Sequence, residues 1–129
     1  MPPITRRFLF TAAALLLSGV SLGLFMLARR ELLGIWPAPG LVSAHVHLIL
    51  VGTVMQLIFG VAWWMFPRPL RTDPQPSETA AQVTWWLLTI GTVARAGGEA
   101  LAPAGTLPLL VLGGGVLQVG GIIAAVVAL

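Results

Sequence analysis

Four apolar segments, each close to the length of a bilayer crossing, constrain this chain more than any other feature. They run over residues 8–28, 41–66, 80–96 and 107–129. A helix of about 20 predominantly apolar residues crosses the hydrocarbon core of a membrane. The pattern predicts an all-α membrane protein, a single domain over residues 1–129 built as a four transmembrane helix bundle.

Composition supports a membrane class and excludes several others. The chain is 57% hydrophobic and 9% charged, with mean hydropathy +0.96. A soluble domain carries about a quarter charged residues, so this chain cannot cover a water-facing surface. It has no cysteine, which excludes disulfides, thiolate-bound clusters and thiol catalysis. The net charge of +3 comes from arginines at segment ends, a pattern of membrane topology with no patch for nucleic acid.

Arginine distribution predicts the orientation. With the N-terminus inside, the cytoplasmic side holds one arginine more than the outer side, and the terminal amine adds to it. We therefore expect a multi-pass protein of the bacterial cytoplasmic (inner) membrane with both termini cytoplasmic, and its first segment is expected to be a retained span. The inner set is Arg6, Arg7, Arg68 and Arg71, and the outer set is Arg29, Arg30 and Arg95.

Small and polar residues inside the segments indicate how the helices pack. Gly19 and Gly23 form a GxxxG pattern, for which packing within the bundle is favoured over a dedicated dimer face. Arg95 and Glu99 lie four residues apart and are expected to pair. Because four short helices bury little surface, we expect membrane lipid around the bundle and consider a homodimer.

The two histidines, His45 and His47, begin the second segment and are the first candidates for haem or metal ligation. At 100° per residue they point about 200° apart and cannot serve one iron. His45 shares a small and polar stripe with Gly52, Gln56 and Trp63, which is expected to face the protein interior. His45 is therefore the better candidate, and Gly52 would leave room for a flat macrocycle. The open alternative is that His45 bonds a neighbouring helix. His47 shares its stripe with Val54, Ile58, Val61 and Met65 and is expected at the interface.

Residues 41–67 carry a resemblance to a known family. The run Ala44-His45-Val46-His47, followed by an apolar stretch and by Phe59-Gly60 and Trp63-Trp64-Met65-Phe66-Pro67, resembles the second transmembrane helix of subunit I in the haem-copper oxidase superfamily. The nitric oxide reductase and cbb3-type branches and the NnrS-like membrane haem proteins are the most similar. The resemblance implies a b-type haem ligated by His45 near the outer face, with His47 at the family position two residues later.

A haem site on His45 would need further ligands and contacts. No other histidine matches a second axial ligand or the three ligands of a copper or iron partner site, so we expect neither copper nor catalysis by this chain alone. A twofold dimer could offer His45 from each chain to one haem. Met26 and Met55 are weaker candidates for a second ligand within one chain. Arg29 and Arg30 lie on the same side as His45 and could pair with haem propionates, or serve only as stop-transfer charges beside Glu31.

Three functions are weighed. The first is a small haem b protein in electron transfer, in sensing, or as an accessory to a respiratory complex. The second is a cofactor-free structural or assembly subunit of such a complex. A small transporter ranks last, because Glu31, Asp73 and Glu78 lie in expected loops and Glu99 at a helix end. A hydrolase is not expected, since no acidic residue is expected near either histidine.

Overall fold

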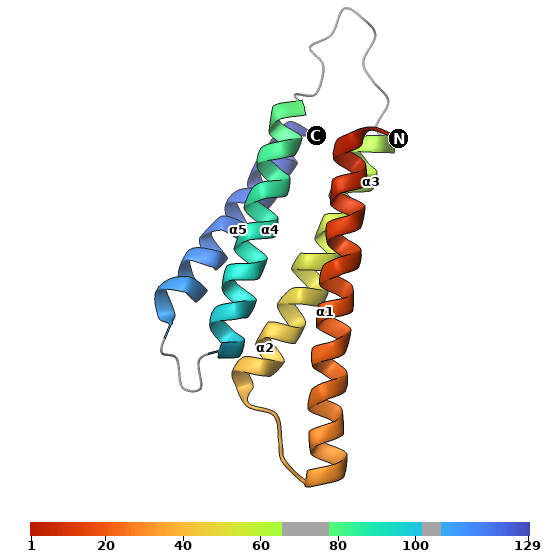
Figure 1. Cartoon of the computed structure of the whole chain (residues 1–129). Helices are drawn as coiled ribbons and strands as arrows, with labels where there is room; N and C mark the ends of the chain where they lie inside the picture. The colour runs from red at the N-terminus through yellow and green to blue at the C-terminus, as the bar shows by residue number, and fades with distance from the viewer. Residues whose placement is uncertain (66–77, 102–106) are drawn as a thin grey trace, which may run out of the picture.

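The computed structural model describes residues 1–65, 78–101 and 107–129, and these residues are mainly helical, with no strand among them (Figure 1). The predicted all-α class is therefore confirmed. In chain order the elements are α1 (Pro3–Leu33), α2 (Pro39–His47), the π-helix η1 (Leu48–Met55), α3 (Gln56–Met65), α4 (Glu78–Leu101) and α5 (Pro108–Ala128).

The elements α2, η1 and α3 are one continuous helix of 27 residues, Pro39–Met65. Its middle has the wider π geometry, and Thr53 Oγ1 donates there to the Leu48 carbonyl oxygen at 3.0 Å and lies 3.4 Å from that of Ala12 in α1. Short π segments within α-helices often mark functional sites. Here η1 begins directly after His47, so it changes the register that an ideal α-helix would impose on the residues below the histidines.

The helices are arranged as two neighbouring pairs (Figure 1). The Pro39–Met65 helix packs along α1, and α5 packs along α4. Both termini lie at one end of the bundle. The start of α2 and the end of α4 meet at the opposite end, which positions both histidines there.

Three of the helices are long and apolar enough to cross a membrane: α1, the Pro39–Met65 helix and α5. The fourth predicted span, residues 80–96, is not confirmed as one. It lies in α4, which has sufficient length at 24 residues but carries Glu78, Arg95 and Glu99 along with several threonines. A polar stripe lowers the mean hydropathy of this helix, although its outward side chains Val83, Trp86, Ile90 and Val93 are exposed and apolar.

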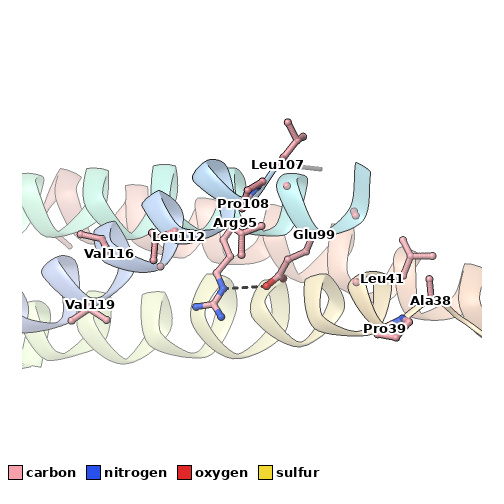
Figure 2. Close-up of a pocket in the computed structure, with 15 residues that line it drawn as sticks. Ala38, Pro39, Leu41, Arg95, Glu99, Leu107, Pro108, Leu112, Val116 and Val119 are labelled. Carbon is pink, nitrogen blue, oxygen red and sulfur yellow. Dashed lines mark hydrogen bonds and ion pairs between the residues drawn. The ribbon is translucent and has the colours of Figure 1, made fainter. Parts of the chain in front are cut away.

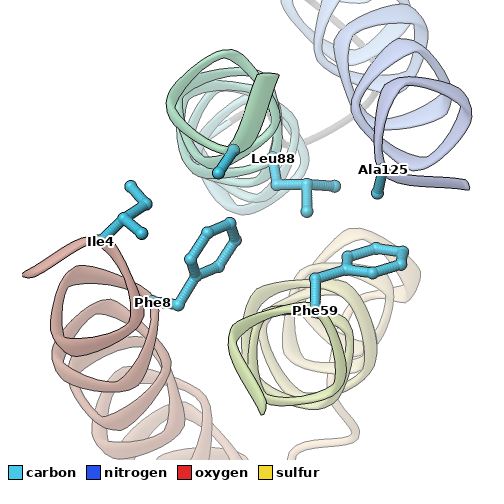
Figure 3. Packing of buried hydrophobic residues seen from close by; sticks show 6 residues of the cluster. Ile4, Phe8, Phe59, Leu88 and Ala125 are labelled. Atoms are coloured by element: carbon cyan, nitrogen blue, oxygen red, sulfur yellow. The ribbon is translucent and has the colours of Figure 1, made fainter. Parts of the chain in front are cut away.

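The apolar core lies in the half of the bundle that holds the termini (Figure 3). Phe8 of α1 and Leu88 of α4 are fully buried, and Phe59 reaches them from α3. Trp63 stacks on Phe8 with ring centroids 5.9 Å apart. Trp85 donates from Nε1 to Thr11 Oγ1 at 3.0 Å, so Trp63 and Trp85 turn inward, whereas Trp64 and Trp86 are exposed.

Glycines permit the closest helix crossings. A Cβ on Gly114 of α5 would lie 2.7 Å from the Gly91 carbonyl oxygen of α4, and one on Gly19 of α1 would lie 2.7 Å from Ile49 Cδ1. A Cβ on Gly23 would lie 2.8 Å from His45 Cε1. The GxxxG pattern of α1 therefore packs within the bundle, as predicted.

The Gly91–Gly114 crossing generates a prediction. A Gly114→Ala substitution should destabilise the protein by about 1–3 kcal/mol, because its methyl group would meet backbone atoms of α4 that cannot shift independently. Thermal unfolding in detergent, followed by circular dichroism, measures the change. The matched control is Gly113→Ala, where the added Cβ meets nothing within 4 Å and the better helix propensity of alanine should add about 0.5–1 kcal/mol. Equal effects at the two positions would contradict the crossing.

Candidate functional site

The His45 ring lies against α1, over the two glycines of its GxxxG pattern. Its Nδ1 is 2.8 Å from the Gly19 carbonyl oxygen. A carbonyl oxygen only accepts hydrogen bonds, so Nδ1 carries a proton and donates, and in the neutral imidazole Nε2 then keeps its lone pair. No residue that the structure describes hydrogen-bonds to Nε2, and His45 is partly exposed. This geometry is the alternative considered above, in which His45 bonds a neighbouring helix. It leaves Nε2, the nitrogen that would ligate a metal, without a partner among the described residues.

The surroundings of His45 within one chain hold little free space. Gly52 is buried, and a Cβ there would lie 3.0 Å from both Leu15 Cδ1 and Thr92 Cγ2. The volume beside Gly52, where the sequence suggested room for a macrocycle, is thus filled by side chains of α1 and α4.

Arg29 and Arg30 lie away from His45, near the end of α1. Arg30 donates from Nη2 to Glu31 Oε1 at 2.6 Å and lies over the Trp36 ring, while Arg29 lies over the Phe25 ring. Since helix residues rise about 1.5 Å each, these arginines are about 9–10 Å further along α1 than Gly23, which contacts the His45 ring. Their contacts match those of charges at a helix end, and the structure does not bring them to His45.

His47 faces α4 and contacts an acid. Its Nδ1 is 2.9 Å from the Ser43 carbonyl oxygen and 3.0 Å from Glu99 Oε2, both acceptors, so the Nδ1 proton is shared between them. The Glu99 side chain is 10% exposed and that of His47 is 18% exposed. The expectation that no acid lies near either histidine is therefore wrong. The interfacial expectation for His47 is also incomplete, because its side chain packs on α4.

Glu99 belongs to a longer polar network on α4. Arg95 donates from Nε to Glu99 Oε1 at 3.2 Å, which confirms the predicted pair, and from Nη1 to Gln118 Oε1 of α5, also at 3.2 Å. Gln118 in turn donates from Nε2 to Thr92 Oγ1. A continuous chain of hydrogen bonds thus links α2, α4 and α5.

A groove opens beside this network, between the start of α2, the end of α4 and α5 (Figure 2). Its volume is about 1070 Å³. Arg95 and Glu99 supply its charged groups, and Leu112, Val116 and Val119 line it from α5. We call it the Arg95 groove.

The described residues fit a haem only in part. The protonated Nδ1 of His45 and its free Nε2 match the usual arrangement of a metal-ligating histidine, whose other nitrogen donates to a carbonyl. The Arg95 groove has the volume for a large cofactor, but its lining contains no histidine, methionine or cysteine to ligate iron. Among the described residues no three His, Cys, Asp or Glu side chains cluster as metal ligands. A haem on His45 would therefore lie at the surface of the bundle.

Comparison with protein-family models, with curated proteins and with solved structures gave no match.

One signal in the sequence could have indicated the His47–Glu99 contact. The predicted orientation places Glu99, Arg95 and both histidines at the same outer level of the membrane. A partly buried histidine and an acid at one depth, on helices with few other polar partners, are expected to meet because lone charges in a membrane are costly.

The network predicts that its two charged members, Arg95 and Glu99, are energetically coupled. Glu99→Gln should destabilise the protein by about 1–3 kcal/mol, because it leaves the Arg95 guanidinium without a charged partner. Removing both charges in Arg95→Gln/Glu99→Gln should cost less than the single Glu99→Gln change. Unfolding in detergent, analysed as a double-mutant cycle, measures the coupling.

The control for this cycle is Glu31→Gln, which breaks the exposed Arg30–Glu31 pair. We expect a loss below about 1 kcal/mol there. If the double variant loses as much stability as Arg95→Gln and Glu99→Gln lose together, Arg95 and Glu99 act independently.

Proposed function

We propose that this chain is a small haem b protein of the bacterial cytoplasmic membrane, in which His45 Nε2 ligates the iron. The observation that carries the proposal is the hydrogen bond from His45 Nδ1 to the Gly19 carbonyl, which fixes the tautomer and presents Nε2 as the ligand. The resemblance of residues 41–67 to the haem-binding helix of haem-copper oxidase subunit I supports the same residue.

The proposal includes a fourth span and an orientation. We propose that α4 crosses the membrane beside α5 with its polar stripe turned inward, and that both termini are cytoplasmic. Support comes from the length of α4, its exposed apolar residues and the grouping of both termini at one end of the bundle (Figure 1).

A second copy of the chain would complete the haem site. Leu15 and Thr92 fill the space within one bundle, so the iron would lie at the surface, where a twofold partner could present its own His45. Bound there, a b-type haem supplies one-electron redox chemistry and reversible gas binding. The residues of this chain hold and orient the imidazole: the Gly19 carbonyl oxygen accepts a hydrogen bond from its Nδ1, and Gly23 leaves room for its ring. Roles in electron transfer, in sensing or beside a respiratory complex follow from that chemistry.

A specific observation favours a second candidate function, a cofactor-free structural or assembly subunit. The close packing around Gly52, together with the Nδ1 hydrogen bond, is also what a purely structural histidine would show. The two functions differ in whether the purified protein takes up haem.

Visible absorption spectra of the detergent-purified protein distinguish them. We expect a Soret band and sharp reduced α and β bands that are lost in His45→Ala. The matched control His47→Ala removes the other imidazole, two residues away, and should keep the bands. Half a haem per chain would support the shared site. A colourless protein that takes up no added haem would contradict the cofactor and leave the structural subunit.

A further inference from the structure

The Arg95 groove places a charged side chain against the apolar surface of α5, one of the helices apolar enough to cross a membrane. The Arg95 side chain is 31% exposed, and the neighbouring Leu112 and Val116 of α5 are exposed as well. A guanidinium has five N–H donors. Nε and Nη1 donate to Glu99 and Gln118, whereas Nη2 has no partner in the part of the chain that the structure describes.

The guanidinium lies within the apolar length of α5. A Cβ on Gly115, seven residues beyond Pro108 at the start of α5, would lie 3.4 Å from Arg95 Nη1. At 1.5 Å per residue this is about 10 Å, or about a third of the thickness of the hydrocarbon core. A hydrogen-bond donor left without an acceptor at that depth is costly. The unpaired Nη2 donor therefore favours a bound molecule that supplies a hydrogen-bond acceptor.

The charges of the network restrict that acceptor. Arg95 and Glu99 neutralise each other, and both Glu99 oxygens already accept hydrogen bonds, one from Arg95 and one from His47. An anion would add an uncompensated charge within the membrane, which is expensive. An uncharged acceptor, of which a carbonyl oxygen is the simplest, adds none.

The remaining lining restricts the body of the occupant. Leu112, Val116 and Val119 recur along one face of α5 and offer only apolar contact beside the guanidinium (Figure 2). We propose that the Arg95 groove binds an uncharged, largely apolar membrane molecule whose carbonyl oxygen accepts a hydrogen bond from Arg95 Nη2. This inference is independent of the haem proposal, because the lining contains no histidine, methionine or cysteine and His45 is outside the groove.

Three probes with apolar chains of similar length and different head groups test the chemical class. The protein in nanodiscs of uncharged lipid is equilibrated with a decyl-substituted benzoquinone, with decylbenzene, or with decanoate, and the probe retained per chain is measured against protein-free discs. We expect saturable retention of the quinone near one per chain and no retention of the other two above the empty discs. Retention of decylbenzene equal to that of the quinone would show that the groove is only an apolar surface. Tighter retention of decanoate would show that it is an anion site. Either result overturns the proposal.

Two variants locate the binding. Arg95→Met removes the donor and should weaken quinone retention about 10-fold or more, since a hydrogen bond from a charged group contributes about 1.5–3 kcal/mol. If Arg95→Met does not fold, Val116→Trp decides, because residue 116 is exposed in the groove and an indole would fill it. The matched control is Leu109→Trp, an exposed position of α5 outside the lining. Retention that is lost in Val116→Trp and kept in Leu109→Trp supports the groove, and full retention in both overturns it.

Discussion

The polar stripe of α4 is the constraint on which the rest of the structure depends. Hydrogen bonds from this helix reach α1 through Trp85, α3 through Thr89, α5 through Thr92 and α2 through Glu99. Between apolar helices in a membrane there is little hydrophobic driving force for association, so packing and polar contacts of this kind stabilise the bundle. Each such bond contributes about 0.6–2 kcal/mol, and their spread over several helices fixes how α4 is rotated.

That rotation determines the surroundings of both histidines. Glu99 is directed toward α2, where it contacts His47 and holds it on α4. His45 lies two residues earlier on α2, so it points to the opposite side of that helix, against α1. One histidine therefore belongs to an ion-pair network, and the other has a fixed tautomer with an unused nitrogen. The proposed haem ligand, His45, and the Arg95 groove lie on different sides of α2 and differ in their chemistry.

The sequence predicted the apolar helices well, because long apolar segments leave few alternatives. The helix class, the Arg95–Glu99 pair and the role of Gly19 and Gly23 in packing all followed from local spacing. The His47–Glu99 contact did not, because it joins residues 52 positions apart. An ideal α-helical projection correctly buried Gly52 and Gln56, but it could not anticipate that η1 would follow His47 or that α4 would pack on its stripe.

The account requires α4 to cross the membrane with its threonines inward and its apolar face toward lipid. Because the chain has no cysteine, single spin labels can be placed at Val83, Ile90 and Val93, with Thr92 as the inward control. Electron paramagnetic resonance then compares relaxation by oxygen, which dissolves in lipid, with relaxation by a water-soluble nickel complex. We predict oxygen access at Ile90 and Val93 and little access of either reagent at residue 92. Access of the nickel complex along the outward face would place α4 in water and contradict the account.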